Sequence, residues 1–251
     1  MVSLFEIINF CDNFLKVTKI KDYEQAHNGL QCENNGTVTK IGAAVDANLL
    51  TMERAVEEKV DLLLAHHGML WGKSIPIVGT IYKKYKILME NNLAVYGVHL
   101  PLDMHGEIGN NVSIVRALEL QQIGQMLVDR AYDFEIPVAS AEYDRSTLEA
   151  KLFALFPDVK CMGFGTKNPK MIAICSGGGG SQVADMIQLG ADTVITGEGP
   201  RHLFDMAYES KINLYICGHY ATETFGIKNL MKLVANKFSL QSTFIEEKCE
   251  L

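Results

Sequence analysis

Five short, uninterrupted apolar runs, separated by amphipathic stretches, constrain the fold of this chain more than any other feature. The runs cover residues 62–65, 93–98, 171–175, 193–196 and 214–217. Helical apolar patterns alternate with them, at residues 77–90, 111–120, 146–156, 181–189, 200–210 and 224–238. Strands buried on both faces are typically continuous apolar runs, and helices between such strands indicate parallel pairing. We therefore predict an α/β fold with mostly parallel sheets flanked by helices.

A polar stretch near the middle of the chain predicts a division into two α/β domains. Residues 127–145 contain Pro137 and have no strong helical period, so we place the boundary near residue 128. The predicted N-terminal domain is 1–128, and the C-terminal domain is 129–251. The C-terminal helix is a candidate to pack back on the first domain. Nearer the N-terminus, the turn sequence Asn-Asn-Gly lies between two strand-like runs and predicts a hairpin around residues 34–36.

Composition excludes several classes of protein. The net charge of −7, from 23 basic and 30 acidic residues, argues against broad binding to nucleic acid or to an acidic membrane. The six cysteines form no CxxC pair, which favours reduced thiols that are mostly buried. The first residues have the spacing of an amphipathic helix and lack a basic leader, and no apolar run is long enough to span a membrane. We expect a soluble, cytoplasmic protein.

Histidines and carboxylates gather where the predicted strands end. His66 and His67 follow the first apolar run, and His99 and Asp103 follow the second. His219 and Glu223 follow the last run, and a helix that began at His219 would place both on one face. Ligands of open α/β sheets bind at the carboxyl ends of the strands, so His66, His67, Asp103, His219 and Glu223 are candidates for one metal site. Taken singly, each motif could equally be an incidental pair, ordinary turn chemistry or a histidine satisfied by a nearby carboxylate.

The number of candidate ligands favours two ions over one. His66, His67, Asp103, His219 and Glu223 provide five nitrogen or oxygen ligands, whereas a structural zinc site needs four and prefers thiolates. Five such ligands suit two divalent ions that share a carboxylate and keep positions open for water. Imidazole and carboxylate are compatible with Zn, Fe, Mn or Ni, and ligand type does not choose among them.

Two further turns carry candidate substrate-binding groups. The segment from Ser176 to Ser181 contains four glycines, among them Gly178, and leads from a strand into a helix. It could present backbone N–H groups to an anion, or it could simply be a tight turn. Glu198 and His202 flank Pro200 after the next strand, near the expected mouth of the site. We expect Ser176, Gly178, Glu198 and His202 to contact a substrate or to orient the metal ligands.

Taken together, the motifs resemble the Nif-three-like family, whose members are often catalogued as GTP cyclohydrolase I type 2 homologues. The segments HNGLQC, AAVDAN, LLLAHHGMLWG, VHLPLD, CSGGGGS, VITGEGPRH and GHYATETFGIKNL occur in the order that the family has them. The resemblance implies two α/β domains with a dinuclear metal centre between them, and a homohexamer. It implies the metal ligands His66, His67, Asp103, His219 and Glu223, with Glu223 or Asp103 bridging. His99 is similar to a residue that contacts substrate or a ligand. Gly68 departs from the family, which usually has proline there.

Three functions are compatible with these residues. The first is a metal-dependent hydrolase that opens a cyclic amide or amidine, including the imidazole ring of a purine nucleotide, with His99 or Glu223 moving protons. The second is a metal-binding protein that handles iron, nickel or zinc or takes part in cofactor assembly. The third is a regulatory or interaction protein that metals only stabilise. An open set of nitrogen and oxygen ligands favours the first two.

Overall fold

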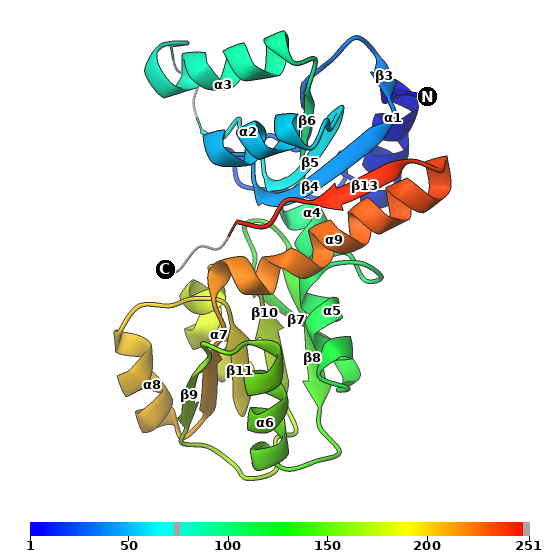
Figure 1. Ribbon diagram of the computed structural model, residues 1–251. Helices are drawn as coiled ribbons and strands as arrows, with labels where there is room; N and C mark the ends of the chain where they lie inside the picture. The colour runs from blue at the N-terminus through cyan, green and yellow to red at the C-terminus, as the bar shows by residue number, and fades with distance from the viewer. Residues whose placement is uncertain (73–75, 248–251) are drawn as a thin grey trace. The chain divides into compact units, whose positions relative to one another are not determined.

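The computed structural model describes residues 1–72 and 76–247, which form two compact units (Figure 1). The first unit contains Met1–Leu102 and the C-terminal segment that starts at Gly226; the second contains Asp103–Phe225. The sequence prediction placed the boundary near residue 128. In the structure the second unit already begins at Asp103, because helix α5 (Asn110–Ala117) packs on strands β8 and β10 of that unit and β7 pairs with β8.

The first unit is built on a five-stranded sheet with the order β13-β4-β5-β6-β2. Strands β4 (Lys40–Asp46), β5 (Leu62–His67), β6 (Ala94–Gly97) and β13 (Gln241–Phe244) are parallel to their neighbours, and β2 (Gly29–Cys32) is antiparallel at the edge. Strand β1 (Val2–Ser3) pairs separately with β3 (Thr37–Val38). The parallel centre of this sheet was predicted from the apolar runs at residues 62–65 and 93–98. Cys249 lies outside the residues that the structure describes.

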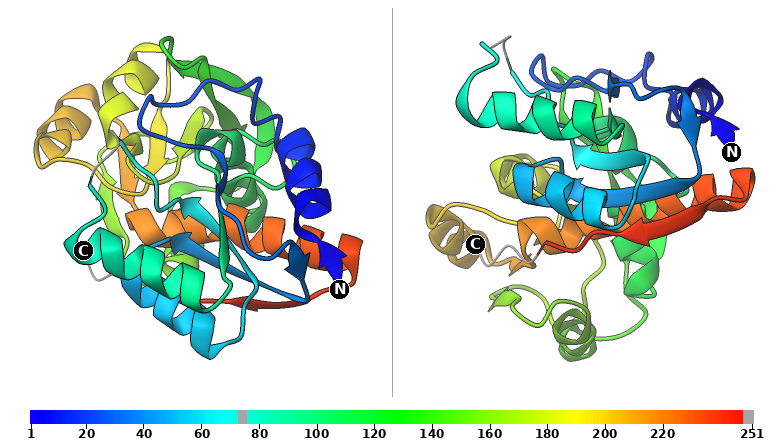
Figure 2. Two further views of the ribbon diagram at one scale, coloured as in Figure 1. Left: turned by 90° about the horizontal axis from the view of Figure 1, so that it is seen from above. Right: turned by 45° about the horizontal axis from the view of Figure 1, so that its top comes forward.

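Helices cover both faces of this sheet. On one face, α2 (Leu49–Glu57) and α3 (Gly79–Glu90) bury Met52 and Leu88 against Leu63 and Val95. Because side chains alternate along a strand, Tyr96 faces the other side, where its hydroxyl donates to Asp12 of α1 (Leu4–Leu15) at 2.9 Å. Helix α9 (His219–Phe238) begins in the second unit and continues into the first. Figure 2 shows these layers in two further views.

The hairpin predicted around residues 34–36 is wrong. A turn does form there, with Gly36 at φ +92° and the side chain of Asn34 accepting from the Gly36 N–H at 2.9 Å. The two flanking strands nevertheless pair elsewhere, because β2 joins β6 while β4 lies between β5 and β13. Strand β4 is buried along five consecutive residues, as expected of a strand with a parallel neighbour on each side, here β5 and β13.

The second unit has a six-stranded sheet with the order β7-β8-β10-β11-β12-β9. Its centre is parallel and consists of β10 (Ile172–Cys175), β11 (Thr193–Thr196) and β12 (Asn213–Ile216). The outer strands are antiparallel, namely β7 (Gln121–Asp129), β8 (Phe134–Ser140) and β9 (Lys160–Gly163). The β7–β8 hairpin occupies most of the polar stretch 127–145. That stretch was interpreted as a domain boundary because it contains Pro137 and has no strong helical period; in the structure, β7 is a mostly exposed edge strand.

Helices α5 and α6 (Arg145–Leu155) cover one face of the second sheet, with Ile114, Leu148 and Leu152 packed on Ile172, Ile174 and Tyr215. Asp144 caps α6 by accepting from the Thr147 N–H at 2.9 Å. A 3-10 turn η1 (Gly179–Gln182), α7 (Val183–Gln188) and α8 (His202–Ser210) follow β10 and β11, and a one-turn helix α4 (Leu100–Asp103) precedes α5. In the described part of the chain, no helix is both long and apolar enough to cross a membrane.

Candidate functional site

His66 and His67 are the last two residues of β5 in the first unit. The strand stays in register with β4 as far as the pair Asp46–His67, so the histidines end the strand and do not follow it as the sequence suggested. His66 is fully buried, and the side chain of His67 is 23% exposed. The two ring centroids are only 4.7 Å apart. The end of the sheet therefore brings together two side chains that a continuing strand would separate.

His99 completes a cluster of three imidazoles. It lies just after β6, and its ring centroid is 5.2 Å from that of His66 and 5.7 Å from that of His67. One ring nitrogen of each histidine lies within 4.8 Å of those of the other two, which is close enough for all three to bind one metal ion. The sequence assigned His99 to proton transfer or substrate contact. The geometry makes it an equal candidate for metal ligation.

The hydrogen bonds of the three rings fit a metal site. Nδ1 of His66 lies 2.9 Å from the carbonyl oxygen of Val98, and Nδ1 of His67 lies 2.9 Å from Oδ1 of Asp46. Nδ1 of His99 lies 2.8 Å from Oδ1 of Asp22. Each acceptor requires a proton on Nδ1, which in a neutral imidazole places the lone pair on Nε2. Histidines that bind metals usually donate their other N–H to a carboxylate or carbonyl in this way.

Asp22 is a positioning residue that sequence reasoning missed. Its Oδ1 accepts from His99, and its Oδ2 accepts from the Leu100 N–H and from Asn28, each at 2.8 Å. Burial would raise the pKa of Asp22, but the hydrogen bond and charge of His99, with the bonds from Asn28 and the Tyr23 N–H, outweigh burial and lower it. Asp22 lies outside any helix or strand, so no periodic pattern marked it. Asp46, in contrast, is the last residue of the apolar strand β4. It could have been predicted, as His66 was, from its place at the carboxyl end of a strand.

A second group of ligands is assembled in the second unit. Helix α9 begins at His219, and Nε2 of His219 lies 3.1 Å from Oε1 of Glu223 one turn later. Nδ1 of His219 lies 3.1 Å from Oε1 of Glu198, which follows β11. Burial alone would lower the pKa of His219, but the hydrogen bonds and charges of Glu223 and Glu198 raise it to about 9. His219 is therefore favoured in its protonated form, and the same two carboxylates, Glu223 and Glu198, would also stabilise a metal cation.

Asp103 lies in the second unit, beside Ser176. Its Oδ1 accepts from Nδ2 of Asn110 at 2.8 Å and from the hydroxyl of Ser176 at 3.1 Å. The Ser176 N–H donates in turn to Oδ1 of Asn111 at 2.7 Å. Ser176 was predicted to contact substrate, and that stays a prediction; its hydroxyl donates to one oxygen of Asp103. Hydrogen bonds of this kind orient a carboxylate that binds a metal.

The four glycines of the turn after β10 serve different purposes. Gly177 has φ +58°, and a Cβ there would overlap Oε1 of Glu223. A Cβ on Gly179 would lie 2.5 Å from the sulfur of Cys175, and one on Gly180 would overlap the backbone of Glu198. Gly178 alone has space, since the nearest atom to its Cβ position is Oε1 of Glu198 at 3.9 Å. Close packing therefore explains three of the four glycines.

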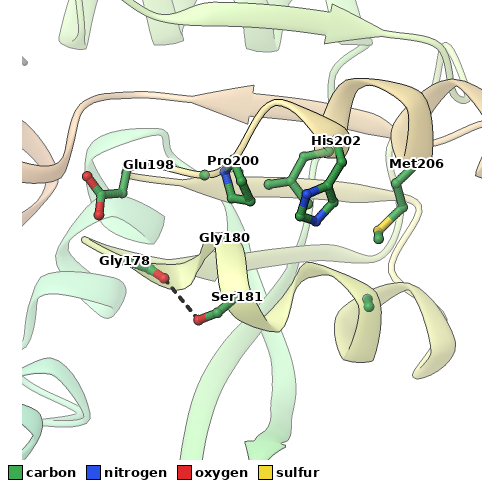
Figure 3. Close-up of a pocket in the computed structure, with 10 residues that line it drawn as sticks. Gly178, Gly180, Ser181, Glu198, Pro200, His202 and Met206 are labelled. Carbon is green, nitrogen blue, oxygen red and sulfur yellow. Dashed lines mark hydrogen bonds between the residues drawn. The ribbon is translucent and has the colours of Figure 1, made fainter.

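A pocket of about 470 Å³ opens beside Gly178 in the second unit. Figure 3 shows that the turn from Gly178 to Ser181 forms one side, and that Pro200, His202 and Met206 face it. Gly178, Glu198 and His202, three of the four residues predicted to contact substrate, line this pocket, and Ser176 does not. None of the lining residues is Lys or Arg, and Glu198 brings a carboxylate. The anion-binding interpretation of the glycine turn gains no support from this lining.

Comparison with known proteins agrees with this architecture. A relative from Pyrococcus horikoshii named "GTP cyclohydrolase 1 type 2 homolog" is 36% identical over 96% of both chains, and one of the same name from Archaeoglobus fulgidus is 30% identical over 98% of both. The solved structure of TTHA1606 from Thermus thermophilus superposes with a TM-score of 0.87 at 30% identity over the whole of both chains. The structure of protein ybgI, of unknown function, gives 0.90 at 30% identity, again over both whole chains.

The family assignment rests on nearly the full length of the chain. A family profile described as "Duf34/NIF3 (NGG1p interacting factor 3)" matches residues 2–250. That range contains both histidine-bearing strand ends, the glycine turn and the start of α9, so the match covers every candidate site residue. The resemblance found in the sequence motifs is confirmed, and the chain belongs to the Duf34/NIF3 family.

Proposed function

We propose that this protein is a metal-dependent hydrolase of small cyclic amides or amidines, a class that includes the bases of nucleotides. One observation carries the proposal: His66, His67 and His99 lie together, and the Nδ1 of each is held by a fixed acceptor. Imidazoles fixed in this tautomer fit a divalent metal ion. The name "GTP cyclohydrolase 1 type 2 homolog" of the relatives supports a cyclic nucleotide base as substrate.

The two units would contribute two sets of ligands. The first set is His66, His67 and His99, and the second is Asp103, His219 and Glu223. Divalent ions held by such ligands supply Lewis-acid polarisation of a substrate oxygen and a lowered pKa for bound water. The sequence predicted two ions held in common by His66, His67, Asp103, His219 and Glu223, without His99, and this stays a prediction. Imidazole and carboxylate together are compatible with Zn, Fe, Mn or Ni.

The residues of the chain suit proton transfer as well as binding. Glu223 is 3% exposed and bonded to His219, which stabilises the ionised carboxylate, the form that would accept a proton from water. His99 is kept in one tautomer by Asp22, whose lowered pKa keeps it ionised at neutral pH. That tautomer leaves Nε2 of His99 as the basic nitrogen. The general base would be whichever of the two keeps an atom that does not hold a metal ion: Nε2 of His99, or one oxygen of Glu223.

The test is turnover by protein loaded with a defined metal. Protein reconstituted with each candidate metal is incubated with GTP, with other nucleotides and with simple cyclic amides, and released formate or ring-opened product is measured. We expect turnover that is lost in the His66→Ala variant and kept in His27→Ala, since His27 is an exposed histidine that bonds only the Gly72 carbonyl among the described contacts. Metal binding without turnover on any of these substrates would exclude the hydrolase.

A second candidate function is metal handling, and the exposure of the ligands favours it. The side chains of His67 and His219 are 23% and 33% exposed, so bound metal would be accessible to chelators and to acceptor proteins. A handling protein must release its metal on a useful timescale. Rapid transfer of metal to a chelator, without turnover of any substrate, would favour handling over hydrolysis. Release over days would exclude it.

A further inference from the structure

The pocket beside Gly178 has the construction of a site for a flat ligand. Its floor is the contact between two turns, because a Cβ on Gly180 would lie against the backbone of Glu198 and Gly199. On one side lies Gly178, and on the other lie Pro200 and Met206 (Figure 3); Leu203 also lines the pocket. Both sides are largely apolar, and the volume of about 470 Å³ falls within the range for small-molecule sites of roughly 300–1,000 Å³.

The polar groups of the pocket select the chemistry of the ligand. The carboxylate of Glu198 is a hydrogen-bond acceptor: its Oε1 lies 3.1 Å from Nδ1 of His219, and 60% of its side chain is exposed. A carboxylate has about four acceptor positions, so Glu198 can accept further N–H bonds from a ligand. None of the described lining residues is Lys or Arg, so no permanently charged cation there compensates the charge of a phosphate. A ligand with adjacent N–H donors and no negative charge at that end is therefore favoured.

The position of Glu198 also gives the ligand a direction. Oε1 of Glu198 lies 3.9 Å from the Cβ position of Gly178 and 3.1 Å from Nδ1 of His219, and Nε2 of His219 lies 3.1 Å from Oε1 of Glu223. A heterocycle whose N–H edge pairs with Glu198 thus lies with that edge toward the ligands His219 and Glu223. The apolar sides would contact its two faces, and dispersion forces and burial would stabilise a ring better than a flexible chain.

We propose that this pocket, defined by Gly178, Glu198, Pro200, Leu203 and Met206, binds the planar base of a nucleoside through its N–H donor edge, with Glu198 as acceptor. This inference rests on the proposed function, because it names the class of substrate that the hydrolase would bind. Binding of the base can nevertheless be measured without any turnover. Sugar and phosphate would extend out of the pocket, which holds no cation for them.

Binding by the purified full-length protein tests the proposal directly. Guanosine has two adjacent donors on its base, inosine lacks the amino group, and inorganic phosphate lacks the base. Calorimetric titration should show that guanosine binds and that inosine binds about tenfold or more weakly, because a hydrogen bond to a charged acceptor is lost. Glu198→Gln should abolish this preference, and Glu209→Gln, which changes an exposed acid on α8, should preserve it.

A second variant blocks the pocket without changing its charge. Gly178 has φ −73° and ψ 18°, which other residues adopt readily, and the nearest atom to its Cβ position is Oε1 of Glu198, a second lining residue, at 3.9 Å. Gly178→Val should weaken guanosine binding at least tenfold. The matched control is Gly106→Val, because Gly106 is exposed, has no atom within 4 Å of its Cβ position and lies outside the pocket. Metal content is measured for every variant, so that loss of base binding is separated from loss of metal.

The outcomes separate this inference from the proposed function. Unchanged guanosine binding in Gly178→Val, equal binding of guanosine and inosine by the wild-type protein, or competition by inorganic phosphate would each overturn it. If the protein binds metal and turns over substrate, and the Gly178 and Glu198 variants do so equally well, the proposed hydrolase function stands and this inference is wrong. Guanosine binding that depends on Gly178 and Glu198, without metal-dependent turnover, would support the pocket and exclude the hydrolase.

Discussion

The carboxylate of Glu223 occupies the place where a side chain on Gly177 would be. Gly177 also has φ +58° and donates its N–H to the hydroxyl of Thr222 at 2.9 Å, so its position is fixed from a second direction. We predict that Gly177→Ala displaces Glu223 and weakens metal binding about tenfold or more, as expected when a ligand is mispositioned. Metal titration against a competing chelator measures this. Gly178→Ala is the matched control and should bind metal like the wild type, because its Cβ position is open.

Asp22 should control metal affinity through His99. Removing the carboxylate in Asp22→Ala frees the imidazole to rotate and to change tautomer, since Oδ1 of Asp22 is 2.8 Å from Nδ1 of His99. Loss of such partners typically costs about 10–100-fold in metal affinity. The same chelator competition measures the effect, and Glu24→Gln, at a nearby exposed acid, should leave affinity unchanged. Equal affinity in Asp22→Ala and the wild type would show that His99 is not a ligand.

Metal binding should depend on pH through His219. The pKa of His219 is raised to about 9 in the metal-free protein, so below that pH a metal must displace its proton. The apparent affinity should therefore rise with pH up to about 9 and then level off. The sign for folding is opposite: the protonated His219 stabilises the metal-free protein fully below its unfolded pKa near 6.5, and this contribution is lost as pH rises through about 9. Glu223→Gln should move both transitions to lower pH.

Gly68 and Gln31 should behave as a coupled pair. A Cβ on Gly68 would overlap the side-chain amide of Gln31, which donates to the His27 carbonyl at 2.6 Å and accepts from the Leu70 N–H at 2.9 Å. Gly68→Ala should destabilise the protein by about 1–3 kcal/mol through overpacking. Adding Gln31→Ala should recover part of that loss, a non-additivity that a double-mutant cycle with urea unfolding detects. Additive effects would show that the two residues do not compete for space.

Leu63 should be important for the stability of the first unit. It is fully buried in β5 within the cluster that includes Met52 and Leu88. Leu63→Ala should destabilise this unit by about 2–5 kcal/mol, whereas Leu50→Ala, on an exposed position of α2, should change stability by less than about 1 kcal/mol. Chemical denaturation followed by the fluorescence of Trp71, the single tryptophan of the chain, reports on the first unit.

The sequence predicted the parallel core well because burial on both faces leaves a simple apolar signal. Each of β5, β6, β10, β11 and β12 lies on one of the apolar runs. The edge strands β7 and β9 were missed, because exposed antiparallel edges carry polar residues and lack that signal. Strand β13 was missed for the same reason, since its four residues are exposed or only partly buried.

The candidate site was predictable where ligands follow a strand. His66, His67, His219 and Glu223 could be identified in that way, and α9 does begin at His219. The role of Ser176 and the importance of Asp22 could not, because both depend on hydrogen bonds between segments distant in sequence. Asp22 and His99 are 77 residues apart. Such pairs have no local pattern that a single sequence could reveal.

The pairing of β13 with β4 has a consequence for the order in which the chain can fold on the ribosome. The second unit is one continuous segment, so it can fold as soon as residue 225 has left the exit tunnel. The first unit begins earlier in the chain, yet its sheet receives its last strand only at Gln241–Phe244. The half of the protein that is translated first is therefore completed last, and a nascent chain halted before that strand would expose one edge of β4.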